Sequence, residues 1–303
     1  MVANNTIIYQ RNTSVSNFKD AILGSSGIDG GHLLLTPQEK EDIIQSHPNS
    51  KQFIRRFVGG GDFLNDKKRY CIWINDDVIK EALKIPPIRE KVDSCRKYRE
   101  SAGRDARKGA SVPHRFIYRK HKDTDAIIFP MTSSSRREYL PIGYSTDRSI
   151  ISNGAFVIYE GTFQLFSILN SKMHNTWMSV TSARMRNDFR YSVNLTYNNF
   201  PFPSISNQRK EELIQCTLRI IDERLKHSEK TLAQLYDPDK MPEGLKEAHH
   251  HNDLAVERCY RSVPFSSDQE RLEYLFKLNK KMIQEEKDKD TLFAKQKKIR
   301  KTK

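Results

Sequence analysis

The sequence predicts an α+β fold, in which a mixed domain over residues 1–203 precedes a small all-α helical domain over 204–283 and a charged, disordered tail over 284–303. Up to residue 203, segments rich in β-branched and aromatic residues alternate with segments that have helical spacing. Two prolines in the stretch 198–203 (NNFPFP) prevent a regular element from continuing. After Ser204 the apolar residues recur at helical spacing only, and a length of 303 residues suits two domains.

The first predicted helix begins at Thr36. Thr36 can cap the helix, Pro37 suits its first position, and Glu39 can complete a capping box with Thr36. The alternating segment 69–75 (RYCIWIN) predicts a strand. Further along we predict a short helix capped by Asp76 or Asp77, a charged helix over 88–101 and a mobile loop over 102–114.

The rest of the mixed region has one helical segment among several β-rich ones. Apolar residues recur at helical spacing over 163–173, which predicts a helix there. Strands are predicted over 126–129, 139–142, 155–159 and 191–197. Beyond residue 204 the helical spacing predicts three helices, over 208–235, 245–260 and 268–283.

Composition excludes two classes of protein. The four cysteines are far apart and lack metal-ligand spacing, so we expect reduced thiols and a cytoplasmic protein rather than a secreted disulfide scaffold. No apolar run approaches the roughly 20 residues of a membrane helix, and the N-terminus lacks the pattern of a signal peptide. With 15 Phe, 12 Tyr and 2 Trp, the chain can bury a core.

The net charge of +14 is concentrated in the mixed region. Residues 1–203 carry 30 basic and 20 acidic side chains, and the stretch 96–122 alone has ten basic side chains against two acidic ones. Tyr98, Phe116 and Tyr118 lie among them. Because Lys and Arg placed on phosphates release condensed counterions, this pattern favours a polyanion partner such as nucleic acid over a merely solvated basic surface.

One glycine run invites comparison with a cofactor loop. Gly59-Gly60-Gly61 resembles the loop that holds S-adenosylmethionine in methyltransferases, which should follow a hydrophobic strand. Here Arg55 and Arg56 precede it, and no Asn-Pro-Pro-Tyr-type catalytic tetrad occurs in the sequence. The sequence therefore favours a turn.

Two other patterns resemble metal sites. Pro238-Asp239 followed by Glu243 lacks the Glu-x-Lys that a nuclease site needs. His249-His250-His251 are adjacent, so on a helix they point in different directions and favour a solvated face over a metal site. We predict no catalytic residue and no metal site in this chain.

The segment 170–200 is rich in side chains that can read base edges. Arg recognises O6 and N7 of guanine, and Asp accepts from the amino group of cytosine. Arg186 and Asp188 are two residues apart, so in an extended backbone they lie on one face and can address the two halves of a G·C pair. The alternative is a salt bridge between them, which the spacing alone favours.

Residues 184–203 (RMRNDFRYSVNLTYNNFPFP) resemble the signature near the end of the target-recognition domain of MmeI-like type IIG/IIL restriction–modification enzymes, which are DNA adenine methyltransferases. Other blocks agree in order, and the resemblance covers about residues 1–283. These blocks lie at 29–35, 53–57, 70–73, 134–143, 235–236, 241–242, 248–249 and 253–260. The resemblance implies a target-recognition domain and a helical C-terminal domain, without the nuclease and methyltransferase domains of the family.

The resemblance also implies a function and partners. The chain is expected to read duplex DNA for an N6-adenine methyltransferase, with or without a nuclease, carried on a separately encoded polypeptide or a missing N-terminal portion. S-adenosylmethionine and Mg²⁺ are expected only on those catalytic domains, with no cofactor in this chain. Two alternatives stay open: a stand-alone RNA-binding protein, and a S-adenosylmethionine-dependent enzyme that uses Gly59–Gly61.

Residue roles follow from the same resemblance. In the family the base-reading residues lie in the stretch that matches 184–190, which favours base contact over the salt bridge. The expected base-reading residues are Arg184, Arg186, Asp188 and Arg190. The side chains expected to hold the DNA backbone are Arg104, Arg107, Lys108, Arg115, Arg119, Lys120, Lys122, Arg136 and Arg137.

Overall fold

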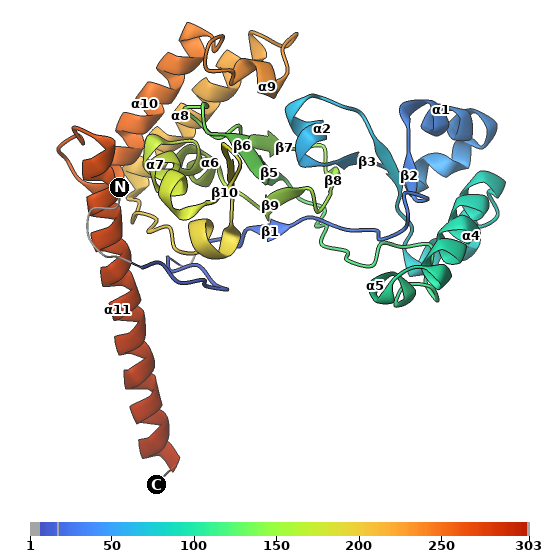
Figure 1. The fold of residues 1–303 in the computed structure, drawn as a ribbon, viewed down its shortest axis with the longest axis horizontal. Helices are drawn as coiled ribbons and strands as arrows, with labels where there is room; N and C mark the ends of the chain where they lie inside the picture. Colours follow the sequence, from blue (N-terminus) through green and yellow to red (C-terminus); the bar gives the residue numbers. More distant parts are fainter. Residues whose placement is uncertain (1–6, 17, 302–303) are drawn as a thin grey trace. The chain divides into compact units, whose positions relative to one another are not determined.

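The structure is a computed structural model that describes the backbone of residues 7–16 and 18–301, and side chains up to residue 289 (Figure 1). Helices and short strands alternate before residue 204, and every described element after it is a helix, so the predicted α+β class with a helical C-terminal region is confirmed. None of the helices in the described ranges is both long and apolar enough to cross a membrane.

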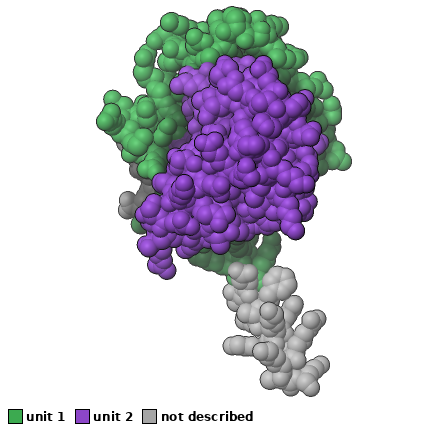
Figure 2. Space-filling view, turned by 90° about the vertical axis from the view of Figure 1, so that its right-hand side faces the viewer, with its two compact units in different colours: residues 1–21, 132–142, 160–303 green, residues 22–131, 143–159 purple. Residues whose placement is uncertain are grey.

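The chain folds into two compact units. Unit 1 comprises residues 1–21, 132–142 and 160–303, and unit 2 comprises residues 22–131 and 143–159 (Figure 2). Both are built from non-contiguous segments, because strand pairing joins them: Thr132–Ser134 pairs with Asp188–Arg190 in unit 1, and Ala126–Pro130 pairs with Ala155–Tyr159 in unit 2. The predicted division of the chain at residue 203 stays a prediction.

Unit 2 contains two four-stranded sheets. The first has the order β2 (Leu34–Leu35), β4 (Tyr70–Ile72), β3 (Ile54–Val58) and β8 (Ile150–Ile151). The second has the order β1 (Ile22–Leu23), β9 (Ala155–Tyr159), β5 (Ala126–Pro130) and β7 (Gly143–Ser145). All neighbouring strands are antiparallel except β3 and β8. The strands predicted over 69–75, 126–129 and 155–159 are confirmed.

The helices of unit 2 are α1 (Pro37–Ser46), α2 (Gly60–Leu64), α3 (Ile79–Ala82), α4 (Pro86–Ser101) and α5 (Arg104–Arg107). Of these, α1 begins where the local chemistry predicts. The helix α5 lies within 102–114, for which the sequence predicts a mobile loop, and Asp76 and Asp77 lie inside a 3₁₀ turn before α3 rather than capping a helix. Thr36 Oγ1 accepts from the Glu39 N–H, and the Glu39 carboxylate accepts from the Thr36 N–H, which confirms the predicted capping box. The α4 helix starts two residues earlier than predicted, since proline fits a first turn in which no N–H bond is needed.

One apolar core holds the first sheet of unit 2 against α4. Ile88, Val92 and Cys95 lie on one face of the helix and are buried against residues that include Leu33 and Ile72. Fully burying an aliphatic side chain of this size stabilises the fold by about 1.5–3 kcal/mol. The core therefore fixes β3 and β4, and with them the side chains on their outer face.

Unit 1 combines helices with one small sheet. The helices are α6 (Phe163–Leu169), α7 (Lys172–Thr181), α8 (Asn207–Leu225), α9 (Leu232–Leu235), α10 (Glu243–Tyr260) and α11 (Asp268–Lys301). The sheet has the order β10 (Ala183–Met185), β11 (Asp188–Arg190) and β6 (Thr132–Ser134). The α8 helix packs on α6 and α10, and α11 packs on α7. The backbone of α11 continues through 284–301, part of the segment for which the sequence predicts a disordered tail.

Two predicted helices are each divided in two. The helix predicted over 163–173 breaks at Asn170, because Ser171 caps α7 by accepting a hydrogen bond from the His174 N–H. The helix predicted over 208–235 ends at Leu225, and α9 begins after its own cap at Thr231. In both places a Ser or Thr hydroxyl satisfies the backbone of a new helix start, which competes with continuing the first helix.

Two predicted strands are wrong for a related reason. The segment 139–142 pairs with no strand, and its Leu140 N–H donates to the side chain of Asn175 instead. The segment 191–197 contains a π-helical turn, Val193–Tyr197, capped by the hydroxyl of Ser192. Both segments bury apolar side chains, but local hydrogen bonds rather than a neighbouring strand satisfy backbone groups in them.

Candidate nucleic-acid interface

The residues predicted to read bases lie on a β-hairpin of unit 1. Strands β10 and β11 are joined by the two-residue turn Arg186-Asn187, and Met185 pairs with Asp188 across it. Strand β11 also pairs with β6, so the hairpin is anchored on one side by a third strand. The predicted extended geometry is wrong for Arg186, which occupies the turn with φ 57°. A non-glycine residue at positive φ is strained, and such strain is concentrated at functional sites.

All four predicted base-reading side chains are exposed. Arg184 lies opposite Phe189 in the hairpin register, and its guanidinium stacks over the Phe189 ring at 4.8 Å. Phe189 is only 8% exposed, so it fixes the hairpin to the unit while Arg186, Asp188 and Arg190 remain in solvent. The ion pairs of the described residues do not include one between Arg186 and Asp188, so the salt-bridge alternative has no support in the structure.

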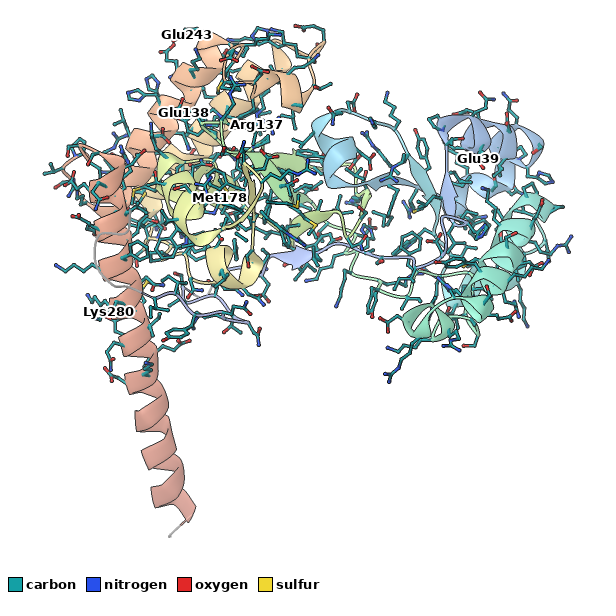
Figure 3. The ribbon with its side chains drawn as sticks, viewed as in Figure 1. Glu39, Arg137, Glu138, Met178, Glu243 and Lys280 are labelled. Atoms are coloured by element: carbon teal, nitrogen blue, oxygen red, sulfur yellow. The ribbon has the colours of Figure 1, made fainter. Side chains whose placement is uncertain are left out.

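The loop that follows β6 adds charge beside this hairpin. Arg137, labelled with Glu138 in Figure 3, is half-buried; burial lowers the pKa of its guanidinium, and the charge of Asp188 acts in the opposite direction. Arg136 is exposed and pairs with Asp239 at 2.6 Å between guanidinium and carboxylate. Arg137 is therefore close enough to Asp188 for the two charges to interact. Arg136 can give up its exposed partner, Asp239, for a phosphate.

The remaining predicted backbone contacts lie in unit 2, on the segment 104–122. Arg104 and Arg107 are exposed on α5, and Lys120 and Lys122 are exposed further along. No ion pair of these four side chains occurs in the part of the chain that the structure describes, which leaves their charges available.

The other three basic side chains of this segment already have protein partners. Lys108 pairs with Asp105 at 2.6 Å, and Arg115 pairs with Asp76 at 2.6 Å. Arg119 donates to the Ile74 carbonyl and to the side chain of Asn75. The two carboxylates are exposed, and exposed pairs contribute about 0–1 kcal/mol, so a phosphate can replace either of them at little cost.

A buried guanidinium holds this basic segment in place. Arg99 of α4 is 0% exposed, and all five of its N–H donors go to backbone carbonyls. The five acceptors are the carbonyls of Gly27, Ile28, Gly109, Val112 and Arg115. Arg99 thereby ties the loop at 27–28 to the stretch 109–115.

The sequence missed three side chains near Arg119. The Arg119 guanidinium stacks on the Trp73 ring at 3.9 Å, and the His121 ring meets the same Trp73 edge-on at 5.7 Å. Arg55 of β3 lines the same pocket. These residues come from three separate segments, and only their cationic and aromatic chemistry in a basic protein could have pointed to them.

The glycine run lies at the junction of β3 and α2. Although Gly59 lies between β3 and α2, its N–H donates to the carboxylate of Asp62 at 2.8 Å. Asp62 also pairs with Arg69, and the Gly60 N–H donates to the Gly154 carbonyl. Two backbone donors of the run, those of Gly59 and Gly60, are therefore used within the protein.

The histidine run is structural at its first member. His249 is buried, with Tyr236 Oη at 2.7 Å from Nε2 and the Asn170 carbonyl at 3.3 Å from Nδ1. Burial lowers the pKa of His249 to about 3, and the nearby Arg224 acts in the same direction. Within the described ranges, no group of three or more His, Cys, Asp or Glu side chains is placed to hold a metal ion.

Comparisons with known proteins match most of the chain. The family described as "MmeI, target recognition domain" matches residues 2–204, and that described as "MmeI, C-terminal domain" matches residues 205–285. The chain is 37% identical to DNA methyltransferase A of Bacillus subtilis over 281 residues, which is 92% of this chain and 32% of that protein.

A solved structure of the type IIL restriction–modification enzyme MmeI in complex with DNA is also similar. It has a TM-score of 0.87 and 32% sequence identity, over 93% of this chain and 38% of that one. The chain thus spans about a third of the length of each of these two relatives.

Proposed function

Because the chain belongs to the family of MmeI target-recognition and C-terminal domains, we propose that it is the duplex-DNA recognition module of a type II restriction–modification system. The relative of known structure is described in complex with DNA, and the curated relative is a DNA methyltransferase. In this proposal the module selects the sequence at which an N6-adenine methyltransferase acts.

The observation that carries the proposal is the exposed hairpin β10–β11. A two-stranded β-ribbon fits the major groove, where each base pair presents a distinct set of donors and acceptors. The hairpin presents Arg186 at its tip and Asp188 and Arg190 on β11, all in solvent. In this arrangement Arg186 donates to guanine O6 and N7, and Asp188 accepts from the amino group of the paired cytosine.

Each unit also carries side chains that can contact the DNA backbone. Arg104, Arg107, Lys120 and Lys122 have no ion-pair partner in the described chain and are the first choice for phosphates. Lys108, Arg115 and Arg136 join them by exchanging an exposed carboxylate for a phosphate. Such contacts set the register and orientation on the duplex without reading sequence.

The catalytic steps belong elsewhere in this proposal. The methyltransferase, its S-adenosylmethionine, and any nuclease with its Mg²⁺ are placed on a separately encoded polypeptide or on a further portion of the protein. The chain spans only about a third of its relatives' length, which supports this division of labour.

The test is equilibrium binding of the full chain to duplex DNA over a salt series. Five to eight phosphate contacts give a loss of about three decades in affinity for a fourfold rise in salt. Single-stranded RNA of equal length serves as competitor. A flat salt response, or displacement of duplex DNA by RNA at equal concentration, would contradict the proposal.

A further inference from the structure

One pocket of unit 2 is lined by two arginines and a histidine. It has a volume of about 350 Å³ and is lined by Arg55 of β3, by Trp73 and Asn75 just after β4, and by Arg119, His121 and Asp123, among others. We propose that this pocket is a preorganised site for one phosphate of the DNA backbone. The inference rests on the proposed function and adds to it an anchor point for the duplex.

Arg119 supplies a guanidinium that is already fixed. Its Nη1 donates to the Ile74 carbonyl at 2.8 Å, its Nη2 donates to Asn75 Oδ1 at 2.6 Å, and its plane stacks on Trp73 at 3.9 Å. These bonds use two of the five donors of an arginine, which leaves three for a ligand. Because the side chain is ordered before binding, little conformational entropy is lost when an anion arrives.

Arg55 supplies the second cation. It lies on β3 directly opposite Cys71 of β4, on the face that also carries Trp73, and it is exposed. No ion pair of Arg55 occurs in the described chain, whereas the neighbouring Arg56 pairs with Asp66 at 3.3 Å and Asp147 at 3.8 Å. On opposite faces of the strand, Arg56 is therefore ion-paired, whereas Arg55 has no ion pair among the described residues.

His121 adds an unsatisfied polar atom at the same place. Its Nδ1 is buried and has no hydrogen-bond partner among the described residues. A buried polar atom without a partner is destabilising, and a ligand that bonds to it removes that destabilisation. Burial lowers the pKa of His121, as do the charges of Arg55 and Arg119, whereas the charge of Asp123 acts in the opposite direction. A neutral imidazole can accept a hydrogen bond from water or donate one to an anion.

The charge balance of the pocket favours an anion. Arg55 and Arg119 are cationic, and the one acidic side chain among the described lining residues, Asp123, lies 3.7 Å from Arg148. Planar guanidinium groups match phosphate oxygens better than an ammonium does. Lys120 and Lys122 flank His121 in sequence and are exposed, so the pocket adjoins the segment already proposed to follow the DNA backbone. That adjacency selects a DNA phosphate over a free metabolite.

The first arm of the test compares Arg55→Gln with Arg56→Gln. Both remove one charge from the same strand, but only Arg55 faces the pocket. DNA binding is measured by fluorescence anisotropy over a salt series. We expect Arg55→Gln to weaken binding about tenfold and to reduce the salt slope by about one unit, and Arg56→Gln to stay within about twofold of the wild type.

The second arm follows the His121 ring by NMR during titration with duplex DNA and, separately, with inorganic phosphate at constant ionic strength. A phosphate near the ring favours the imidazolium, so both ligands should raise the His121 pKa in the wild type and do so less in Arg55→Gln. Phosphate alone should require far higher concentrations, because it lacks the other contacts of the duplex. A response to phosphate but not to bound duplex would overturn the assignment to DNA.

The outcomes separate this inference from the proposed function. If the chain binds duplex DNA but the two glutamine variants behave alike, the phosphate pocket is refuted and the DNA module stands. If the chain binds no duplex at all, the DNA module fails and this assignment of the pocket fails with it. Binding that is lost equally in both variants would point to general charge rather than to a site.

Discussion

Arg99→Lys should uncouple the basic segment from its scaffold. Arg99 is completely buried and makes five hydrogen bonds to backbone carbonyls, whereas a lysine has three donors. At least two carbonyls therefore lose their partner in a buried site. At about 1–2 kcal/mol for each, the free energy of unfolding falls by about 2–4 kcal/mol.

The predicted effect on DNA binding distinguishes a positioning role from a merely structural one. Arg99 fixes the stretch 109–115, which connects α5 to Lys120 and Lys122. When that stretch loosens, we expect about two phosphate contacts to be lost. The slope of log affinity against log salt should then become shallower by about 1.8.

Val92→Ala is the matched control. Val92 lies on the same face of α4, is 1% exposed and contacts no part of the basic segment through hydrogen bonds. Its truncation should destabilise the fold by about 2–3 kcal/mol but leave the salt slope unchanged. Urea unfolding gives the stability and anisotropy gives the slope. Equal slopes for Arg99→Lys and Val92→Ala, at equal loss of stability, would refute the positioning role.

Two further predictions follow from exposed and buried charges. Lys120→Ala should weaken binding to all duplex sequences by a similar factor, as measured with a panel of unrelated duplexes, because a phosphate contact carries no sequence information. Burial lowers the pKa of His174 to about 4 and that of His249 to about 3. The folded state therefore keeps both rings neutral, and the free energy of unfolding falls as pH drops below their unfolded pKa near 6.5. Burial raises the pKa of Asp253 to about 7, so its stabilisation is full below about pH 4 and is lost as pH rises towards 7, in opposition to the histidines. Asp253→Asn should therefore make stability fall more steeply between pH 6 and 4.5, by about 1.4 kcal/mol per pH unit in urea unfolding, and an unchanged slope would contradict this reading.

Local chemistry predicted much of the fold. The capping box at Thr36 and the alternating segment around Trp73 each carry their signal within a few residues, and both were confirmed. The β10–β11 hairpin was missed because its turn, Arg186-Asn187, has no glycine, and a positive φ at arginine has no sequence signature. The strand predicted over 191–197 failed because Ser192 supplies a cap that outweighs the alternation.

The candidate site could be predicted only in part. The basic segment was evident from its charge, but not which of its side chains are already paired, since Asp76 lies about 40 residues from Arg115 in sequence. Arg99 follows Val92 and Cys95 at helical spacing, so its burial could have been predicted from position. Counting it only as one of the basic residues hid that position. Arg55 lies 64 residues before Arg119 in sequence, and only the fold brings the two side chains to one pocket.

The hairpin itself offers the most direct test of base reading. The double variant Arg186→Asp, Asp188→Arg exchanges donor and acceptor on the hairpin. Its control is the double variant Arg136→Asp, Asp239→Arg, which exchanges an ion pair of the same unit whose charged atoms are 2.6 Å apart. Each variant of the full chain, and the wild type, selects from randomised duplexes. The account predicts that the hairpin exchange converts G·C to C·G at one position by a factor of about ten or more, and that the ion-pair exchange selects the wild-type sequence. Selection of the same sequence by all three proteins would contradict base reading by Arg186 and Asp188.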